Sequence, residues 1–354
     1  VNGGVRRGNF AEKYYYHRIK SCLTPIIMRT KTTFTLLIIT AFYFFYFILN
    51  GCTSQPENRH HKKAKLKGTI SISGAFALYP MTVKWAEEFM QLNPGVRIDI
   101  SAGGAGKGMA DVLSEMVDLA MVSREIAPAE IEKGAWYLAV CKDAVLGTIN
   151  ESNPYVKEIK QYGISRETLT KIYIDVTIEN WDQIPGISAN NQKINVYTRS
   201  DACGAAEMWG LFFGKNQESL QGIGVFGDPG IADAVKNDKF GIGFNNVIYA
   251  FDINTRKKFE GLEIIPIDLN NNGVIDPDEN FYDNLDDICA AIGNEQYPSP
   301  PARDLYLISK GEPKNLIVIE FLKWILTEGQ QYVNDAGYVR LSESKIETEM
   351  QKIK

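Results

Sequence analysis

Apolar and polar positions alternate along the first part of the folded region in a way that predicts strands followed by helices. Residues 68–73 alternate with a period of two, which is typical of a strand. Residues 81–91 place their apolar side chains on one side of a predicted helix. A second strand (96–100), a glycine-rich turn (101–108), a helix (109–116) and a buried strand (117–122) follow. This order is a βαβ pattern, and it predicts an α/β fold.

The same alternation continues to the end of the chain. Further strands are predicted at 145–149, 241–244, 262–267 and 304–308, and further helices at 231–236, 280–292 and 315–327. Residues 342–354 are charged, and we expect a tail there that is helical or frays. A chain of 354 residues exceeds one ordinary hydrophobic core, so we expect two lobes.

The pattern near the N-terminus is different and indicates export. Residues 1–27 show no periodicity, and we interpret them as an over-extended start that precedes Met28. Basic residues and then a long apolar run up to Leu49 predict a signal peptide at 28–51. The residues around Cys52 resemble a lipobox, which predicts lipid attachment at Cys52 and a polar tether over 52–67. The alternative is an uncleaved membrane anchor.

Composition and charge exclude several classes of protein. Apolar residues make up 45% and charged residues 23% of the chain, which describes a globular protein. The net charge of -5 argues against a nucleic-acid partner. The five cysteines lack a metal-binding or disulfide pattern, and they are Cys22, Cys52, Cys141, Cys203 and Cys289. The three histidines all precede residue 68, so the folded region has none for acid–base chemistry, and we expect a protein that is not an enzyme.

One stretch, residues 195–213, predicts a site for an anion. It reads as a short strand that ends near Arg199, a turn of small and polar residues, and a helix. The free N–H groups at a helix start favour negative charge, and an arginine offers two parallel donors to an oxyanion. The alternative is that Arg199 pairs with Asp201 or Glu207 on a hydrated surface.

The glycine-rich turn at 101–108 matches neither nucleotide motif. Gly106 and Lys107 are followed by glycine instead of the hydroxyl residue of a phosphate loop, and the glycine spacing is GxGxG instead of GxGxxG. The turn therefore predicts only a general anion cradle at a helix start.

With these pieces in order, the chain resembles the type II periplasmic binding proteins of ABC importers, specifically the phosphate-binding lipoprotein family. The resemblance spans about residues 68–341, and its most specific carriers are GISRETLTKIYIDVTIENWDQI, VYTRSDACGAAEMW and RDLYLISKGEP with the FLKWILTEGQQYVNDAGYVRL that follows. It implies two α/β lobes joined by two crossing strands. We expect lobe one at 68–145 and 261–341, and lobe two at 146–260.

The resemblance also implies an oxyanion site in the cleft between the lobes. Its donors would come from four places in the chain: Ala75 and Phe76; Gly104, Ala105 and Gly106; Ser123 and Arg124; and Arg199, Cys203, Gly204 and Ala205. Two guanidinium groups would then make a small positive pocket. Arg303 is interpreted as part of a structural salt bridge.

This chain departs from the family pattern in ways that bear on the ligand. Ala75, Ala105, Cys203 and Ala205 stand where hydroxyl donors are typical, and Arg124 stands where some members have aspartate. Each lost hydroxyl bond to a charged ligand weakens binding by roughly 1.5–3 kcal/mol unless another donor replaces it. The expected ligand is inorganic phosphate or a related tetrahedral oxyanion, with sulfate, molybdate and tungstate as the alternatives.

The resemblance implies partners as well. We expect a monomeric capture protein, tethered to the membrane outside the cytoplasm, that passes its ligand to an ABC permease and ATPase. The alternatives are a sensor or binding lipoprotein without a role in transport and, less favoured, a phosphate-ester hydrolase.

A separate motif predicts a structural calcium ion. Residues 268–279 fit D-x-[DN]-x-[DN]-G-x5-E at every constrained position. The ligands would be Asp268, Asn270, Asn272, the Val274 carbonyl, Asp276 and Glu279. A strand stands where an EF-hand has its incoming helix, and no second loop pairs with it, so the ion would brace the fold. The alternative is an acidic turn without a metal.

Overall fold

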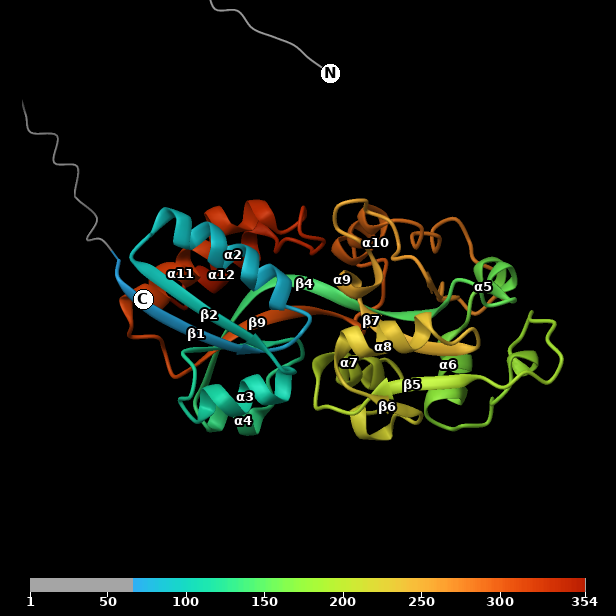
Figure 1. Cartoon of the computed structure of the whole chain (residues 1–354). Coiled ribbons are helices and arrows are strands. Elements are labelled where there is room, and N and C mark those ends of the chain that lie inside the picture. Colours follow the sequence, from blue (N-terminus) through green and yellow to red (C-terminus); the bar gives the residue numbers. More distant parts are fainter. Residues whose placement is uncertain (1–65, 354) are drawn as a thin grey trace, which may run out of the picture. The chain divides into compact units, whose positions relative to one another are not determined.

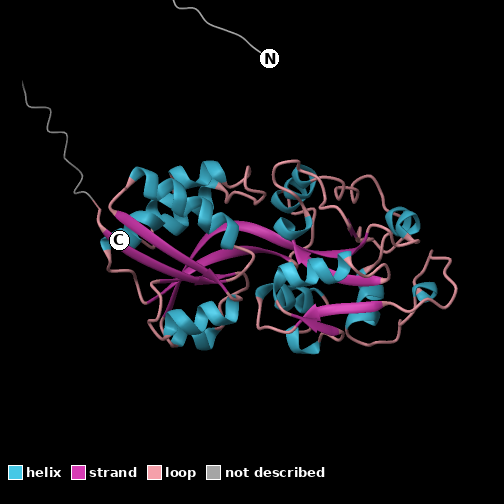
Figure 2. Ribbon diagram, in the orientation of Figure 1, coloured by secondary structure: helices cyan, strands magenta, loops and turns pink. Residues whose placement is uncertain are grey.

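The structure is a computed structural model that describes residues 66–353. Its strands are β1 (Gly68–Gly74), β2 (Val96–Ala102), β3 (Leu119–Val122), β4 (Ala135–Asn150), β5 (Asn195–Arg199), β6 (Ile223–Val225), β7 (Gly241–Asn246), β8 (Leu262–Ile264) and β9 (Ala302–Lys310). Its helices are α2 (Tyr79–Leu92), α3 (Ala105–Leu113), α4 (Pro128–Glu132), α5 (Val156–Tyr162), α6 (Arg166–Tyr173), α7 (Gly204–Phe212), α8 (Gly227–Lys236), α9 (Val247–Ala250), α10 (Leu285–Gly293), α11 (Leu316–Leu326) and α12 (Glu343–Met350). Figures 1 and 2 show their arrangement.

The strands form one long sheet in the order β2-β1-β3-β9-β4-β7-β5-β6, with β8 paired to β4. The long strand β4 joins the two halves of this sheet. Its first part, up to Ala144, pairs antiparallel with β9, and its second part, from Val145, pairs with β7 and β8. The chain crosses between two α/β lobes within β4 and returns at Ala302, where β9 begins (Figure 1). This confirms the predicted α/β fold of two lobes with crossing strands.

Each lobe buries its own hydrophobic core. In lobe one, α2 and α11 cover the sheet, and Phe89 packs with Phe321 and Trp324 at ring-centroid distances of 5.1 and 5.7 Å. In lobe two, Trp209 of α7 packs against Tyr173 and Phe244 at 5.8 Å. Such aromatic contacts add about 0.5–1.5 kcal/mol each beyond the burial of their area. Each lobe is therefore held together by a core of its own.

The predicted second boundary between the lobes, at residue 261, is wrong. Strand β8 pairs with the lobe-two part of β4, with Ile264 opposite Thr148. Apolar residues from Leu262 to Tyr297 lie in the lobe-two core. Lobe one resumes only at Ala302. The prediction failed because the sequence of β8 does not determine which strand it pairs with in the folded protein.

The C-terminal segment is an ordered part of lobe one. Helix α12 packs beside α11, and Ile346 and Ile353 are buried in the lobe-one core. Glu349 is buried and accepts a hydrogen bond of 3.0 Å from the Ala139 amide and an ion pair of 2.7 Å from Lys352. Of the two alternatives expected for this segment, the helix is confirmed and fraying is wrong, because these contacts hold the segment on the core.

The predicted N-terminal segments lie outside the described residues. These are the over-extended start at 1–27, the signal peptide at 28–51, Cys52 and most of the tether at 52–67. Within residues 66–353, no helix combines the length and the apolar character needed to span a membrane.

Candidate functional site

Arg199 ends strand β5 at the boundary between the lobes, and its guanidinium group is buried. Its Nε and Nη2 atoms bind the two carboxylate oxygens of Asp201 at 2.8 and 2.6 Å. Its Nη1 atom binds Asp228 of α8 at 2.6 Å. Arg199 thus pairs with Asp201, but the pair is buried instead of lying on a hydrated surface. Three of the five guanidinium N–H groups are used, so two remain for another acceptor.

The charge around Arg199 is not positive. Burial opposes the charged form, but Asp228 and then Cys203 and Asp201 raise the pKa of the Arg199 guanidinium above its usual value. One cation held between two carboxylates has a formal net charge of -1. Any attraction for an anion must therefore come from hydrogen-bond donors and from helix dipoles instead of from a net positive charge.

Arg124 does not add a second free cation. Its Nη1 and Nη2 atoms bind the Glu130 carboxylate at 2.9 and 2.7 Å, and Nη1 also binds the Glu125 carbonyl oxygen. The hydrogen bond to Glu130 raises the pKa of Arg124. The expectation of a small positive pocket made by two guanidinium groups is wrong, because Glu130 of α4 neutralises Arg124.

The backbone amides predicted as donors fall into two groups. Four are already bonded within the protein: Ala75 N–H to Met121 O (2.8 Å), Gly104 N–H to Gly74 O (3.1 Å), Gly106 N–H to Ala202 O (3.1 Å) and Cys203 N–H to Gln217 Oε1 (2.9 Å). Among the described residues, no acceptor binds the amides of Phe76, Ala105, Gly204 and Ala205. These four are the available donors.

The free amides follow from local structure. Ala105 is the first residue of α3, and Gly204 and Ala205 are the first two residues of α7, so their N–H groups have no partner within the helix. Gly104 precedes α3 with a φ of 90°, a value that favours glycine. Cys203 caps α7, since its Sγ atom accepts a hydrogen bond from the Ala206 amide. Burial raises the pKa of the Cys203 thiol to about 12, which keeps it protonated.

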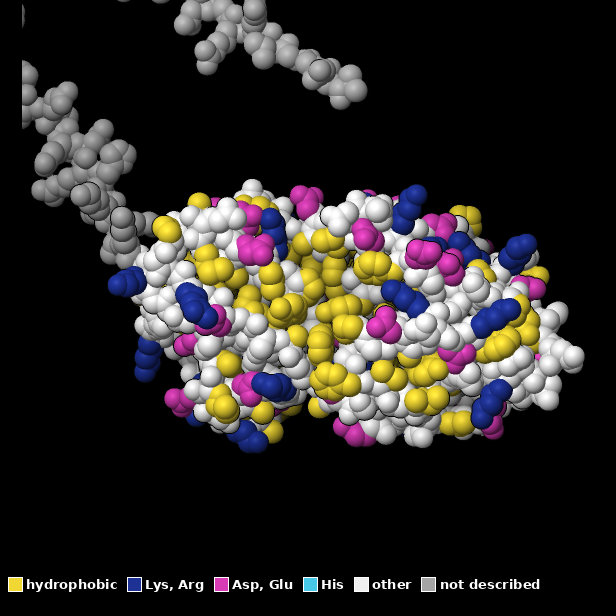
Figure 3. Space-filling view, viewed as in Figure 1, with side chains coloured by type: hydrophobic (Ala, Val, Ile, Leu, Met, Phe, Trp, Pro, Cys, Tyr) yellow, Lys and Arg dark blue, Asp and Glu magenta, His cyan; other side chains and the backbone are white. Residues whose placement is uncertain are grey.

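The lobes meet directly around these donors. The Gly106 amide of lobe one donates to the Ala202 carbonyl of lobe two. The ring of Phe76 lies 5.7 Å from the Arg199 guanidinium and 6.0 Å from the ring of Phe226. Apolar side chains gather over the middle of the face shown in Figure 3, around the line where the lobes meet. The donors therefore lie in a closed, partly apolar environment, in which hydrogen bonds to charge are strong.

Ser123 contributes a hydroxyl group to the same place. It follows β3, is 1% exposed, and faces Gly204 at the start of α7. Within the described chain its Oγ atom has no hydrogen-bond partner. The structure therefore brings together Phe76, Ala105, Ser123, Arg199, Gly204 and Ala205 from both lobes, as a set of unused donors. Asp228 was not predicted as part of the site, because nothing in its local sequence marks it as the partner of Arg199.

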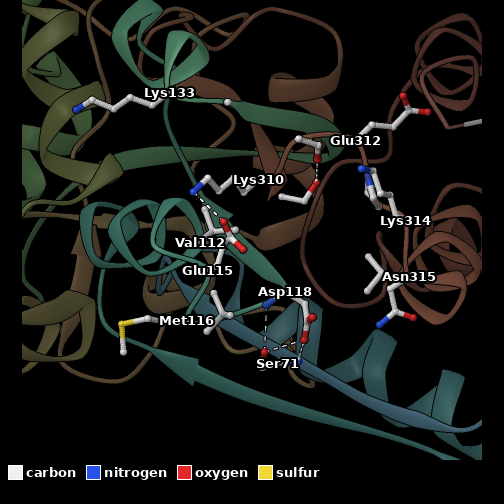
Figure 4. A pocket seen from close by; sticks show the side chains of 16 residues that line it. Ser71, Val112, Glu115, Met116, Asp118, Lys133, Lys310, Glu312, Lys314 and Asn315 are labelled. Atoms are coloured by element: carbon white, nitrogen blue, oxygen red, sulfur yellow. Dashed lines mark hydrogen bonds and ion pairs between the residues drawn. The ribbon is translucent and has the colours of Figure 1, made fainter.

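A cavity elsewhere on lobe one is a separate feature. It has a volume of about 690 Å³ and is lined in part by Lys133, Lys310 and Lys314 (Figure 4). Lys310 forms an ion pair of 2.9 Å with Glu115, and Asp118 accepts hydrogen bonds from Ser71. None of the predicted oxyanion-site residues lines this cavity.

The predicted calcium loop folds back on itself within lobe two. The Asp268 carboxylate accepts hydrogen bonds from the amides of Asn272 and Gly273, and the Glu279 carboxylate accepts them from Leu269, Asn270 and Asp276. The two carboxylates are 5% and 4% exposed, and no described lysine or arginine forms an ion pair with them. The segment before the loop is strand β8, and the helix after it, α10, begins at Leu285.

The donor set of this loop suits a hard cation only if neutral oxygens take part. In the described part of the chain, no three Asp, Glu, His or Cys side chains converge as a metal site. The Asn270 and Asn272 side-chain nitrogens donate to Asp276, while their oxygens accept from backbone amides. Calcium accepts amide and carbonyl oxygens as ligands, so Asn270, Asn272 and the Val274 carbonyl fit the ion once these side chains turn their oxygens inward.

Comparison with known proteins identifies the family. The model of the PBP superfamily domain matches residues 60–328 of this chain, which is most of its length. The chain belongs to the PBP superfamily. Within curated proteins, it is similar to the phosphate-binding protein PstS of Bacillus subtilis, with 27% identity over 286 residues that cover 80% of this chain and 84% of that protein. It is also similar to the phosphate-binding protein PstS of Methanocaldococcus jannaschii, with 23% identity and coverage of 83% and 87%.

Solved structures support the same PBP superfamily fold. A protein from Clostridium perfringens whose crystal structure contains bound phosphate has a TM-score of 0.64 and 21% identity, covering 78% of this chain and all of that one. An ABC-type phosphate transport receptor from Vibrio cholerae has a TM-score of 0.57 and 19% identity, covering 77% of this chain and all of that one. At these identities the likeness shows a shared fold, the type II arrangement of two lobes.

Proposed function

We propose that this protein is an extracytoplasmic substrate-binding protein that captures inorganic phosphate, or a related tetrahedral oxyanion, for an ABC importer. The single observation that carries the proposal is the set of unused donors at the meeting of the lobes: the amides of Phe76, Ala105, Gly204 and Ala205. The names of the curated relatives point to phosphate as the ligand.

The proposed site binds by hydrogen bonding and helix dipoles. The starts of α3 and α7 both supply free N–H groups, and each helix start favours negative charge by about 0.3–1 kcal/mol or more when partly buried. Ser123 Oγ and the two remaining Arg199 N–H groups complete the donors. Closure of the lobes around the ligand excludes water, which strengthens each of these bonds.

The choice of oxyanion depends on acceptors as well as donors. A protonated phosphate needs an acceptor for its hydrogen, whereas a sulfate, molybdate or tungstate does not. The carboxylates beside Arg199 already accept bonds from it, and Asp201 also accepts the Gly227 amide at 3.1 Å. With Arg124 bound to Glu130, the Ser123 hydroxyl oxygen is the unused side-chain acceptor of this predicted set, and the other unused groups are donors. The fully ionised anions therefore stay as the alternative ligands.

The remaining parts of the proposal concern location and partners. We propose that the chain is a lipoprotein, exported by a signal peptide at 28–51 and anchored to the membrane through Cys52, at the periplasmic or cell-surface side. It acts as a monomer and delivers its ligand to an ABC permease and ATPase. Its role is binding without catalysis, in keeping with relatives that are binding proteins and with a folded region that lacks histidine. Replacing Cys52 with Ser is expected to release the exported protein from the membrane fraction.

We further propose that the loop at 268–279 holds a structural calcium ion. Two supports are the match of the whole loop to the calcium motif and the burial of Asp268 and Glu279 without a cationic partner among the described residues. Buried carboxylates are costly unless they are paired or bind a metal. The ion would tie the end of lobe two, where the Ile275 amide also bonds to the Gln161 carbonyl oxygen, into one unit.

Isothermal titration of the mature protein with phosphate, sulfate, molybdate and tungstate tests the ligand. We expect one site per chain and the tightest binding for phosphate. Ser123→Ala should weaken binding about tenfold or more, because a hydrogen bond to a charged ligand contributes roughly 1.5–3 kcal/mol. Ser219→Ala is a matched control, since Ser219 bonds only to its neighbours Asn216 and Gln221 in lobe two. No heat of binding with any of the four anions would refute the proposed function.

A further inference from the structure

A buried series of polar side chains runs from Arg199 to the strands that cross between the lobes. Asp228 binds Arg199 through Oδ2 at 2.6 Å and accepts a hydrogen bond of 2.5 Å from Asn246 Nδ2 through Oδ1. Asn246 Oδ1 in turn accepts a hydrogen bond from Arg303 Nη2. Asp228, Asn246 and Arg303 are buried, with exposures of 2%, 1% and 4%. The anion-site arginine is therefore linked to the crossing region without passing through water.

Asn246 is the member of this series that both donates and accepts. Its neighbours fix its orientation: a flipped amide would place oxygen against the Asp228 carboxylate and N–H groups against the Arg303 guanidinium. Both contacts would be repulsive and would leave buried polar groups without a partner, which is unfavourable. The orientation of Asn246 thus holds the Asp228 carboxylate, and the carboxylate holds Arg199.

The far end of the series lies where the lobes join. Asp143 of β4 and Arg303 of β9 stand opposite each other, one position from Ala144 and Ala302, where the chain passes between the lobes. Their ion pair is long, 3.4 Å, and Asp143 Oδ1 and Arg303 Nε have no partner within the described chain. Asn246 lies opposite Val145, immediately past this point. A shift of the crossing strands would therefore directly change the hydrogen bond between Arg303 and Asn246.

We propose that Asn246 is a positioning residue for the anion site: it holds Asp228, and through it Arg199, in register with the crossing strands. The proposal rests on the proposed function for its effect on affinity. Two charged groups contact the Asn246 side chain, Asp228 from α8 and Arg303 from β9. Asp143 of β4 lies one step beyond Arg303, and Arg199 of β5 lies one step beyond Asp228. Loss of the Asn246 amide should therefore move Arg199 even though no hydrogen bond joins the two.

Asn246→Asp tests this with a side chain of nearly the same shape. At pH 8 the introduced carboxylate is ionised and cannot donate to Asp228, so affinity for inorganic phosphate should fall about tenfold or more relative to wild type. Two adjacent buried carboxylates raise the pKa of one of them, so we expect the introduced carboxyl group to take up a proton as the pH falls to 5.5 and then to donate again. At this pH the ratio of the variant's phosphate affinity to that of wild type should approach one. Because variant and wild type are measured at the same pH, the titration of phosphate itself affects both affinities equally and cancels in their ratio.

Asn153→Asp is the matched control, because Asn153 is also buried in lobe two and its Nδ2 atom has no partner among the described residues to lose. It should lower stability but leave the affinity ratio near one at both pH values. A wild-type affinity for Asn246→Asp at pH 8 would overturn the positioning role.

A second readout separates this inference from the proposed function. In ligand-free protein at pH 8, the Nε resonance of Arg199 should shift in Asn246→Asp and stay in place in Asn153→Asp. If wild type does not bind phosphate, the proposed function fails while this resonance still decides the positioning role. An unmoved Arg199 resonance in Asn246→Asp would refute it.

Discussion

Ser123 of lobe one and Gly204 of lobe two are in direct contact where the lobes meet, with no room for a side chain at Gly204. A Cβ atom built on Gly204 would lie 2.2 Å from the Ser123 carbonyl oxygen and 2.3 Å from its Oγ atom, distances that real Cβ atoms do not reach. Gly204 is the first residue of α7, so this contact brings the free amides of a helix start onto the other lobe. A glycine at this position is therefore required for the two lobes to approach each other. The fold of each lobe by itself does not require it.

Gly204→Ala should prevent full closure and abolish tight phosphate binding. The three atoms nearest to its Cβ would all belong to Ser123 of the other lobe, so each lobe should still fold. We expect at least a hundredfold loss of affinity by calorimetry, since a loss of about 3 kcal/mol follows from separating the donors of the two lobes. The melting temperature of the ligand-free protein should change little.

Gly293→Ala is the control for this change, because Gly293 ends α10 and a Cβ there would lie 3.3 Å from one side-chain atom of Val339, a contact that a small shift relieves. It should bind as wild type does. Wild-type affinity in Gly204→Ala would show that binding does not need the lobes to approach as they do here.

Removal of calcium should lower the thermal stability of the protein if the loop at 268–279 holds this ion. Asp268→Asn removes a buried carboxylate at the first ligand position, so the melting temperature of the variant should no longer respond to chelator. Wild type should lose several degrees on chelation, in line with a contribution of a few kcal/mol from the bound ion.

Asp278→Asn removes the same charge from an exposed position of that loop which is not a ligand position. It should keep the chelator response of wild type. A wild-type melting curve that is the same with calcium and with chelator would contradict the metal proposal while leaving the oxyanion site untouched.

The stability of the protein should carry a pH dependence from Asp143. Burial raises the pKa of this carboxyl to about 6, because it outweighs the attraction of Arg303. The folded state then binds the proton more tightly than the unfolded chain, whose carboxyl titrates near its ordinary value. Ionised Asp143 therefore costs stability above pH 6, and this cost is relieved as the pH falls from about 6 towards about 4.

Asp143→Asn removes that titration. Between about pH 7.5 and pH 5, the unfolding free energy of wild type should rise relative to the variant by about 1 kcal/mol, as measured by urea unfolding at both pH values. A constant difference between the two proteins would show that Asp143 does not titrate in this range.

The sequence predicted those parts of the site that depend on local structure. Strand β5 ends at Arg199, and a turn of small residues then leads into helix α7, in the order that the pattern of strand, small residues and apolar helix face indicated. The free amides of Ala105, Gly204 and Ala205 follow from the helix starts alone, whereas that of Phe76 lies in the turn before α2. The α/β order and the two lobes followed from periodicity and from the family resemblance.

The predictions that were wrong concern contacts between segments that are distant in the sequence. Asp228 reaches Arg199 from 29 positions away, and Asn246 joins it from another strand. Neither contact has a signature in sequence spacing, so the net charge of the site was predicted with the wrong sign. The pairing of β8 with β4, which moves residues 261–301 into lobe two, is a tertiary choice of the same kind.

The most direct test of the account follows the backbone amides themselves. In a protein labelled with ¹⁵N, addition of phosphate should move the amide proton resonances of Phe76, Ala105, Gly204 and Ala205 downfield, because these groups gain a charged acceptor. The amides of Ala75 and Cys203, which are already bonded within the protein, should move much less. Phosphate binding that leaves all four resonances unmoved would contradict the claim that these amides form the oxyanion site.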